Sequence, residues 1–146
     1  MVGAYLDASV LVSLLLGEPS SAVVERWIAD VELPLLVSDF AAAEVSSAVA
    51  LAVRQGRETA ENGAGRLSDF DNWRTEAPTV PIAIHPEDIR MADQIVRAFD
   101  LGLRAPDAVH LATAQRLNAR LITLDRRLLR AASALGVEAI SPGGPD

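Results

Sequence analysis

Two aspartates stand directly after stretches of the chain that are predicted to be strands. Asp7 follows the apolar run 2–6, and Asp125 follows the run 120–124. In an open α/β sheet, ligands bind at the carboxyl ends of the strands, so both carboxylates are candidates for such a site. Either acid taken alone could instead serve only as the N-cap of the helix that follows it.

Two further acids occupy positions that are unusual for solvated side chains. Glu44 lies in the apolar stripe of a predicted helix, close to Ala48 and Leu51. A buried acid is costly unless it is paired or binds a metal, and a salt bridge to a buried arginine is the alternative. Asp107 lies in the first turn of a predicted helix that is apolar almost all round, which indicates a buried helix. A favourable interaction with the helix dipole is the other explanation for this acid.

Four acids without a nearby histidine or cysteine suit a hard cation. Mg²⁺ and Mn²⁺ prefer oxygen ligands, and Mg²⁺ keeps several waters beside one or two carboxylates. Such ions can activate a water molecule for in-line attack on a phosphodiester. The acids Asp7, Glu44, Asp107 and Asp125 therefore predict a metal-dependent phosphodiesterase site.

The composition excludes several other kinds of site. The 146 residues contain no cysteine, which rules out disulfides and thiolate chemistry, and no lysine, which rules out a Walker-type phosphate loop. The net charge of −7 has the wrong sign for a broad nucleic-acid surface, and could reflect carboxylates gathered to bind cations. No apolar run reaches the roughly 18 residues of a membrane span, so we expect a cytoplasmic protein without a membrane partner.

Strands and helices alternate along the predicted pattern. This alternation indicates an α/β fold, a three-layer α/β/α sandwich with a mainly parallel central sheet. We expect one domain over residues 1–140 and a flexible tail over 141–146. One predicted helix, 86–99, places Ile89, Ala92, Val96 and Phe99 on a common face. The predicted strands are 2–6, 35–37, 79–84, 120–124 and 137–140, and the other predicted helices are 20–30, 38–54, 58–73, 106–118 and 126–134.

Four segments carry a family resemblance. YLDASVLV (5–12), SDFAAAEVSSA (38–48), RAPDAVHLATA (104–114) and LITLDRRL (121–128) resemble, in order, the motifs of PIN-domain proteins. The length is also similar to that of a free-standing PIN domain of the VapC toxin type. The resemblance covers nearly the whole chain, and the four motifs together are more specific than any one of them.

The resemblance implies a ribonuclease that uses Mg²⁺ or Mn²⁺ and serves as the toxin of a toxin–antitoxin pair. Asp7, Glu44, Asp107 and Asp125 match the metal-binding acids of the family. It further implies a homodimer and an antitoxin protein that covers the site. Ser9 and Thr123 match positions where a hydroxyl assists the site, although a helix cap and an ordinary strand residue are alternatives, and we favour the second for Thr123. The family usually has further acids after the fourth motif, where this chain has Arg126 and Arg127, so the number of metal ions is left open.

Other polar residues allow two interpretations each. Arg104, Arg126 and Arg127 could bind an RNA backbone, or they could belong to solvated faces of an acidic protein. We interpret His110, one turn after Asp107, as a core histidine without a metal role. The small basic area favours selective cutting of an exposed single-stranded RNA loop.

Three other functions compete with the toxin hypothesis. A haloacid-dehalogenase-type phosphatase or a receiver domain also has an aspartate after its first strand, but both use a lysine, which this chain lacks. A non-catalytic interaction module would have no need of four acids. A PIN-type nuclease of RNA maturation would keep the same site outside any toxin pair.

Overall fold

A five-stranded sheet forms the centre of the protein in a computed structural model that describes residues 3–144. All described strand pairs are parallel, and the strand order is β3-β2-β1-β4-β5. The central strand β1 pairs with β2 on one side and with β4 on the other. The strands are β1 (Ala4–Leu6), β2 (Leu35–Ser38), β3 (Thr79–Ile82), β4 (Arg120–Ile122) and β5 (Ala139–Ile140).

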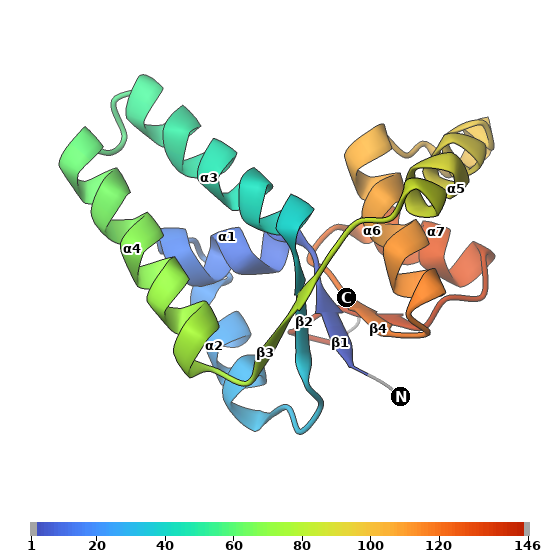
Figure 1. The fold of residues 1–146 in the computed structure, drawn as a ribbon, viewed down its shortest axis with the longest axis horizontal. Coiled ribbons are helices and arrows are strands. Elements are labelled where there is room, and N and C mark those ends of the chain that lie inside the picture. The colour runs from blue at the N-terminus through green and yellow to red at the C-terminus, as the bar shows by residue number, and fades with distance from the viewer. Residues whose placement is uncertain (1–2, 145–146) are drawn as a thin grey trace.

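Helices cover both faces of this sheet (Figure 1). The first four lie on one face and the last three, with a short 3₁₀ helix, lie on the other. The predicted three-layer α/β/α sandwich is therefore confirmed. The helices are α1 (Ala8–Leu16), α2 (Ser21–Asp30), α3 (Asp39–Arg54), α4 (Ala60–Glu76), α5 (Pro86–Val96), η1 (Phe99–Leu101), α6 (Ala105–Arg116) and α7 (Arg126–Ala134).

Two apolar cores lie between the layers. Because successive strand residues point to opposite faces, Ala4 and Leu6 pack into the core under α1–α4, while Tyr5 packs into the core under α5–α7. Helix α6 is buried at seven consecutive positions from Ala108 to Ala114, which confirms that this helix lies inside the fold. Asp107, in the first turn of this helix, is thereby held beside the sheet.

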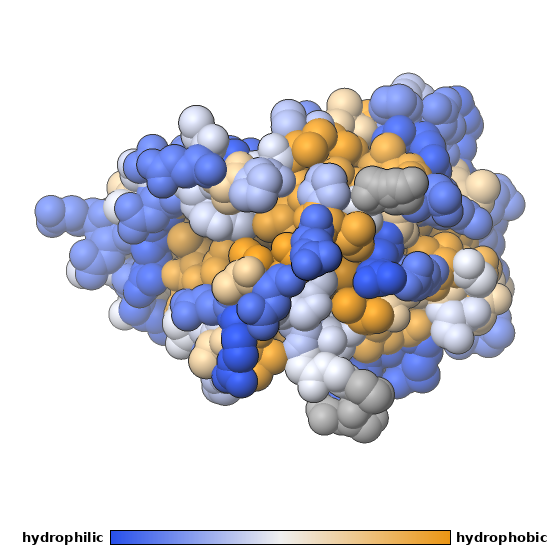
Figure 2. Space-filling model, turned by 90° about the horizontal axis from the view of Figure 1, so that it is seen from below, coloured by the Kyte–Doolittle hydropathy of each residue, from blue (hydrophilic) through white to orange (hydrophobic). Residues whose placement is uncertain are grey.

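The polar character of the surface is uneven. Figure 2 shows the face from which β1 and β2 begin, where hydrophobic side chains form a band flanked by hydrophilic ones. The carboxyl ends of the strands, which carry the predicted site, lie on the opposite side of the molecule.

Helix α1 is the α-helix that the sequence pattern did not predict. Its residues are apolar almost throughout, so they give no helical alternation of polar and apolar positions. The local signals are its ends: Asp7 caps the amino terminus, and Gly17 ends the helix in the left-handed conformation.

Helix α5 differs from its predicted boundary and face. It ends at Val96, and Phe99 belongs to η1 with 88% of its surface exposed. Of the predicted face, Ala92 is buried and Val96 packs partly buried against the core, whereas Ile89 is 51% exposed; the other buried residues are Asp88 and Ile95. The predicted face is therefore correct at Ala92 and Val96 and wrong at Ile89 and Phe99. The helix is rotated about its axis relative to the prediction, because Asp88 faces inward and pairs with Arg116 of α6. The prediction placed no charged residue on the inward face.

The chain after the last strand begins with a turn. Ser141 accepts hydrogen bonds from the backbone N–H groups of Gly143 and Gly144, and Pro142 is buried. Residues 1, 2, 145 and 146 lie outside the described part, and so do the start of the predicted first strand and the end of the predicted tail. Between residues 3 and 144, no single helix is long and apolar enough to cross a membrane; only α1 and α2 together meet that length and composition, with a bend of 111° between them.

Candidate active site

The order of the strands places the site beside β1. The chain moves from β1 to β2 on one side and reaches β4 on the other, so the crevice between the carboxyl ends of β1 and β4 is the switch point of the sheet. Asp7 follows β1 directly, and Asp125 comes three residues after the end of β4. The two aspartates singled out by their position after strands therefore flank the same crevice.

Asp7 is held firmly at this point. Its side chain is only 4% exposed, and it caps α1. Oδ1 accepts hydrogen bonds from the Ser9 hydroxyl at 2.6 Å and from the Val10 N–H at 3.2 Å, while Oδ2 accepts one from the Thr123 hydroxyl. Burial raises the pKa of Asp7 most strongly, and the hydrogen bonds from Ser9 and Thr123 oppose this rise.

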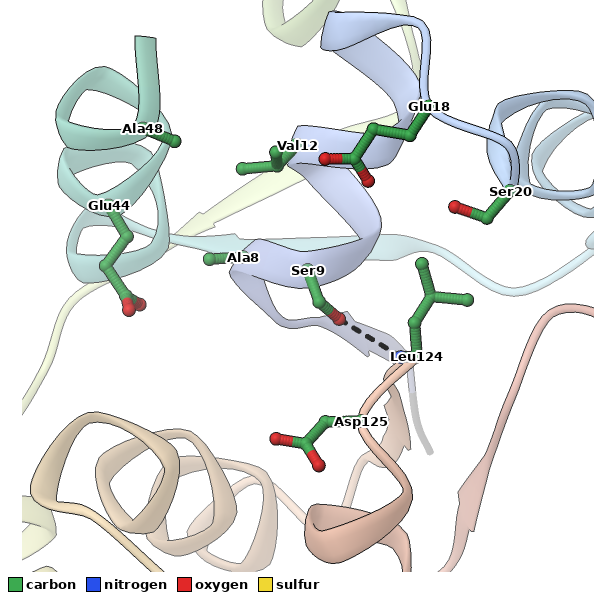
Figure 3. A pocket seen from close by; sticks show the side chains of 9 residues that line it. All are labelled: Ala8, Ser9, Val12, Glu18, Ser20, Glu44, Ala48, Leu124 and Asp125. Atoms are coloured by element: carbon green, nitrogen blue, oxygen red, sulfur yellow. Dashed lines mark hydrogen bonds between the residues drawn. The ribbon is translucent and has the colours of Figure 1, made fainter. Parts of the chain in front are cut away.

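Thr123 links the two aspartates. Its fully buried hydroxyl donates to Asp7 Oδ2 and accepts from the Asp125 N–H at 3.0 Å. The interpretation of Thr123 as an ordinary strand residue is therefore wrong. Ser9 adds a second link, because its Oγ accepts from the Leu124 N–H at 3.0 Å (dashed line in Figure 3). The two hydroxyls tie the start of α1 to the segment that carries Asp125.

Glu44 and Asp125 face a common cavity. Figure 3 shows their carboxylates pointing into the same space, one from α3 and the other from the segment before α7. The cavity has a volume of about 510 Å³, and apolar side chains of α1 and α3 form part of its wall. Asp125 Oδ1 also caps α7 by accepting from the N–H groups of Arg127 and Leu128. The helix-cap explanation for Asp125 is thus correct, but it occupies only one carboxylate oxygen.

A second cavity, of about 650 Å³, adjoins Asp125 from the other side. Its walls hold two acids and four arginines, so it combines the acidic centre with a basic flank. It is lined by Arg104, Asp107, Asp125, Arg126, Arg127 and Arg130. The three arginines predicted to bind RNA therefore lie together beside the acids.

Like charges crowd the centre of the site. The pKa of Asp107 is raised by burial and then by the negative charge of Asp125, with a smaller contribution from Glu44. Nearby Arg104 and His110 act in the opposite direction. A cation bound among these carboxylates would relieve their repulsion and would favour their ionised forms.

The acids fit a hydrated ion better than a closed metal cage. Within residues 3–144, no group of three or more histidine, aspartate or glutamate side chains lies close enough to surround a metal by itself. Mg²⁺ commonly binds one or two carboxylates and keeps several waters, which agrees with acids distributed over two adjoining cavities. Glu18, Glu44 and Asp125 line the first cavity, and Asp107 and Asp125 line the second. The donor atoms are oxygens, as Mg²⁺ and Mn²⁺ require.

His110 lies closer to the acids than predicted. It is 2% exposed, which confirms its burial, but Nε2 is hydrogen-bonded to Glu44 Oε1. The expectation that no histidine lies near the four acids is wrong. The arginine partner considered for Glu44 is also replaced by this histidine. The fold brings the two together from positions 66 residues apart, so no local pattern could have shown the contact.

Two other arginines of the C-terminal part of the chain, Arg116 and Arg120, form ion pairs away from the site. Arg116 pairs with Asp88, and Arg120 pairs with Glu138 at 2.7 Å. Neither arginine lines the second cavity, where four other arginines lie.

Comparisons with known proteins agree with the fold and with the order of the motifs. The sequence matches the family described as PIN domain over residues 4–134. A curated relative, ribonuclease VapC46 of Mycobacterium tuberculosis, is 34% identical over 145 residues, which are 97% of this chain and 99% of the relative.

Two solved structures are similar in fold. VapC20 of Mycobacterium tuberculosis, described as a sarcin-ricin loop cleaving toxin, superposes with a TM-score of 0.70 at 16% identity and covers 92% of this chain and 96% of its own. VapBC2 of Rickettsia felis, solved with a DNA fragment from its promoter, has a TM-score of 0.68 at 14% identity, with 97% and 98% coverage. At these identities the similarity establishes the shared fold.

Proposed function

The chain belongs to the PIN-domain family, and from this membership we propose that it is a Mg²⁺- or Mn²⁺-dependent endoribonuclease, the toxin of a toxin–antitoxin pair. The observation that carries the proposal is that four acids lie around the switch point of the sheet. Asp125 lines both cavities, Glu44 and Asp107 line one each, and Thr123 connects Asp7 to Asp125. Such an arrangement is typical of a site that binds cations.

Asp7, Glu44, Asp107 and Asp125 would hold the ion. When bound, the ion would supply water activation and charge neutralisation at the phosphate. Ser9 and Thr123 keep the Asp7 carboxylate in one orientation, because their hydroxyls donate to its two different oxygens. The chain contains no lysine and no cysteine, so the acids are the candidate groups for this chemistry at the crevice.

Arg104, Arg126 and Arg127 would bind the RNA phosphates next to the cleaved bond. They line the same cavity as Asp107 and Asp125, so a phosphate bound there lies beside the acids. The whole chain has a charge of −7, and a basic area confined to one cavity contacts few phosphates. We therefore propose selective cutting within an exposed single-stranded loop of a structured RNA.

An antitoxin protein would be the partner of this chain, and a homodimer its assembly. Relatives of the same fold are described as toxin–antitoxin complexes, among them one from Klebsiella pneumoniae with a TM-score of 0.65. Light scattering of the purified chain tests the dimer, and a strictly monomeric protein at high concentration would contradict it. A short neighbouring reading frame whose product co-purifies with the chain would support the antitoxin over a role in RNA maturation.

The proposed activity is tested by incubating the purified chain with total RNA and mapping the new ends. Cleavage should require Mg²⁺ or Mn²⁺ and should disappear in Asp7→Asn, which keeps the size of the side chain and removes its charge. Glu61→Gln is the matched control, because Glu61 is an exposed acid in the first turn of α4 and lines neither cavity. Equal cleavage by wild type and Asp7→Asn would refute the site, and a chain that neither cuts RNA nor binds Mn²⁺ would indicate an interaction module.

A further inference from the structure

His110 has contacts that a merely space-filling core histidine does not need. Both ring nitrogens are engaged: Nδ1 is 2.7 Å from the Tyr5 hydroxyl, and Nε2 is hydrogen-bonded to Glu44 Oε1. The ring also lies against two aromatic rings, with centroid distances of 5.7 Å to Tyr5 and 5.4 Å to Phe40. The orientation of the imidazole is therefore determined from several sides.

The contacts continue beyond the histidine to the start of α3. The Tyr5 hydroxyl donates to Ser38 Oγ at 3.0 Å, and Ser38 Oγ caps α3 by accepting from the Ala41 N–H at 3.0 Å. Glu44 lies one turn further along the same helix. A chain of hydrogen bonds thus joins the central strand, α6 and α3, and it ends on the Glu44 carboxylate.

Glu44 depends on this support more than Asp7 and Asp125 do. The Asp7 carboxylate is buried and accepts three hydrogen bonds, and Asp125 is held as the cap of α7. Glu44 has a longer side chain that is 29% exposed beside the cavity, and within residues 3–144 its carboxylate is hydrogen-bonded to His110. Without His110, the carboxylate would be free to sample other rotamers and to turn toward solvent.

We infer that His110 is a positioning residue, which holds the Glu44 carboxylate in the orientation that binds the catalytic cation. The inference rests on the proposed metal-dependent function. The hydrogen bond engages Oε1, so Glu44 would present its remaining lone pairs to the ion from a defined direction. Partners that orient metal ligands typically change metal affinity or activity about 10- to 100-fold when they are removed.

The test is Mn²⁺ binding measured by calorimetry without RNA. His110→Leu should weaken Mn²⁺ binding about 10- to 100-fold. His110→Gln should recover part of this loss, because an amide N–H can donate to Glu44. His85→Leu is the control, since His85 is the only other histidine, is exposed, and pairs with Glu87 away from the site. Wild-type affinity in a folded His110→Leu protein, or no recovery in His110→Gln, would overturn the inference.

A double-mutant cycle separates positioning from general damage to the fold. If His110 acts through Glu44, His110→Leu should not weaken Mn²⁺ binding further in a Glu44→Gln background. Additive losses would overturn the inference. If His110→Leu does not fold, the wild-type imidazole decides: Mg²⁺ should shift the NMR signal of His110 Nε2 and not that of His85, and an unmoved His110 signal would overturn the inference. A wild-type chain that binds no Mn²⁺ at all would instead refute the proposed function.

Discussion

Removing the hydroxyl of Thr123 tests the link between the two aspartates. Thr123→Val keeps the shape of the side chain but removes a hydroxyl that is fully buried. Two partners then lose a hydrogen bond, namely Asp7 Oδ2, which belongs to a buried carboxylate, and the N–H of Asp125. Each polar group left unsatisfied costs about 1–3 kcal/mol, so we expect a loss of about 3 kcal/mol in the free energy of unfolding. For a domain of this size this corresponds to a fall in Tm of about 10 °C.

Thr113→Val is the matched control for this change. Thr113 is also fully buried, but its hydroxyl donates to the carbonyl of Val109, one turn earlier in the same helix, and its other neighbour is the Tyr5 hydroxyl, which keeps its contacts with Ser38 and His110. In an α-helix that carbonyl also accepts a backbone N–H and stays satisfied. Removing the Thr113 hydroxyl should therefore lower the free energy of unfolding by less than about 1 kcal/mol. Urea unfolding of both variants and cleavage of RNA below their melting temperatures provide the measurements. Equal destabilisation by the two substitutions, or full cleavage by Thr123→Val, would refute the assignment of Thr123 as the link.

Three further outcomes are expected from the same geometry. Activity should vanish in EDTA and return with Mg²⁺ or Mn²⁺ but not with Ca²⁺, and full activity in the chelator would contradict the mechanism. Because burial raises the pKa of Asp7, its ionised form destabilises the fold above that pKa. Asp7→Asn should therefore raise the melting temperature at pH 7 and by less at pH 4, and an unchanged gain would contradict the sign. Burial raises the pKa of Asp88, but the hydrogen bonds and charge of Arg116 outweigh it, so the net shift is downward. The contribution of Asp88 to stability is present above the ordinary aspartate pKa and is lost as the pH falls through the folded-state value, so Asp88→Asn should lower stability by about 2 kcal/mol at neutral pH and by less near pH 3. A difference in urea midpoint that is the same at both pH values would argue against this pair.

The four acids could be singled out from the sequence because each has an unusual position relative to its neighbours along the chain. Asp7 and Asp125 follow apolar runs that became strands, and parallel strands end at one edge of a sheet. Glu44 and Asp107 interrupt helices whose other positions are mainly apolar. These signals come from periods of two and 3.6 residues, which are properties of neighbouring residues along the chain. The α/β layering follows from the same local patterns.

The partners of the acids were decided by the tertiary structure alone. Thr123 lies 116 residues from Asp7, and His110 lies 66 residues from Glu44, so no spacing along the chain connects either pair. The rotation of α5 that buries Asp88 is likewise set by a tertiary contact, namely the ion pair between Asp88 and Arg116 of α6. Local sequence determines which segments become helices and strands, since their hydrogen bonds and apolar faces involve near neighbours. The hydrogen bonds that orient the acids form only when the strand order brings distant segments to one crevice, and that order is set by packing across the whole chain.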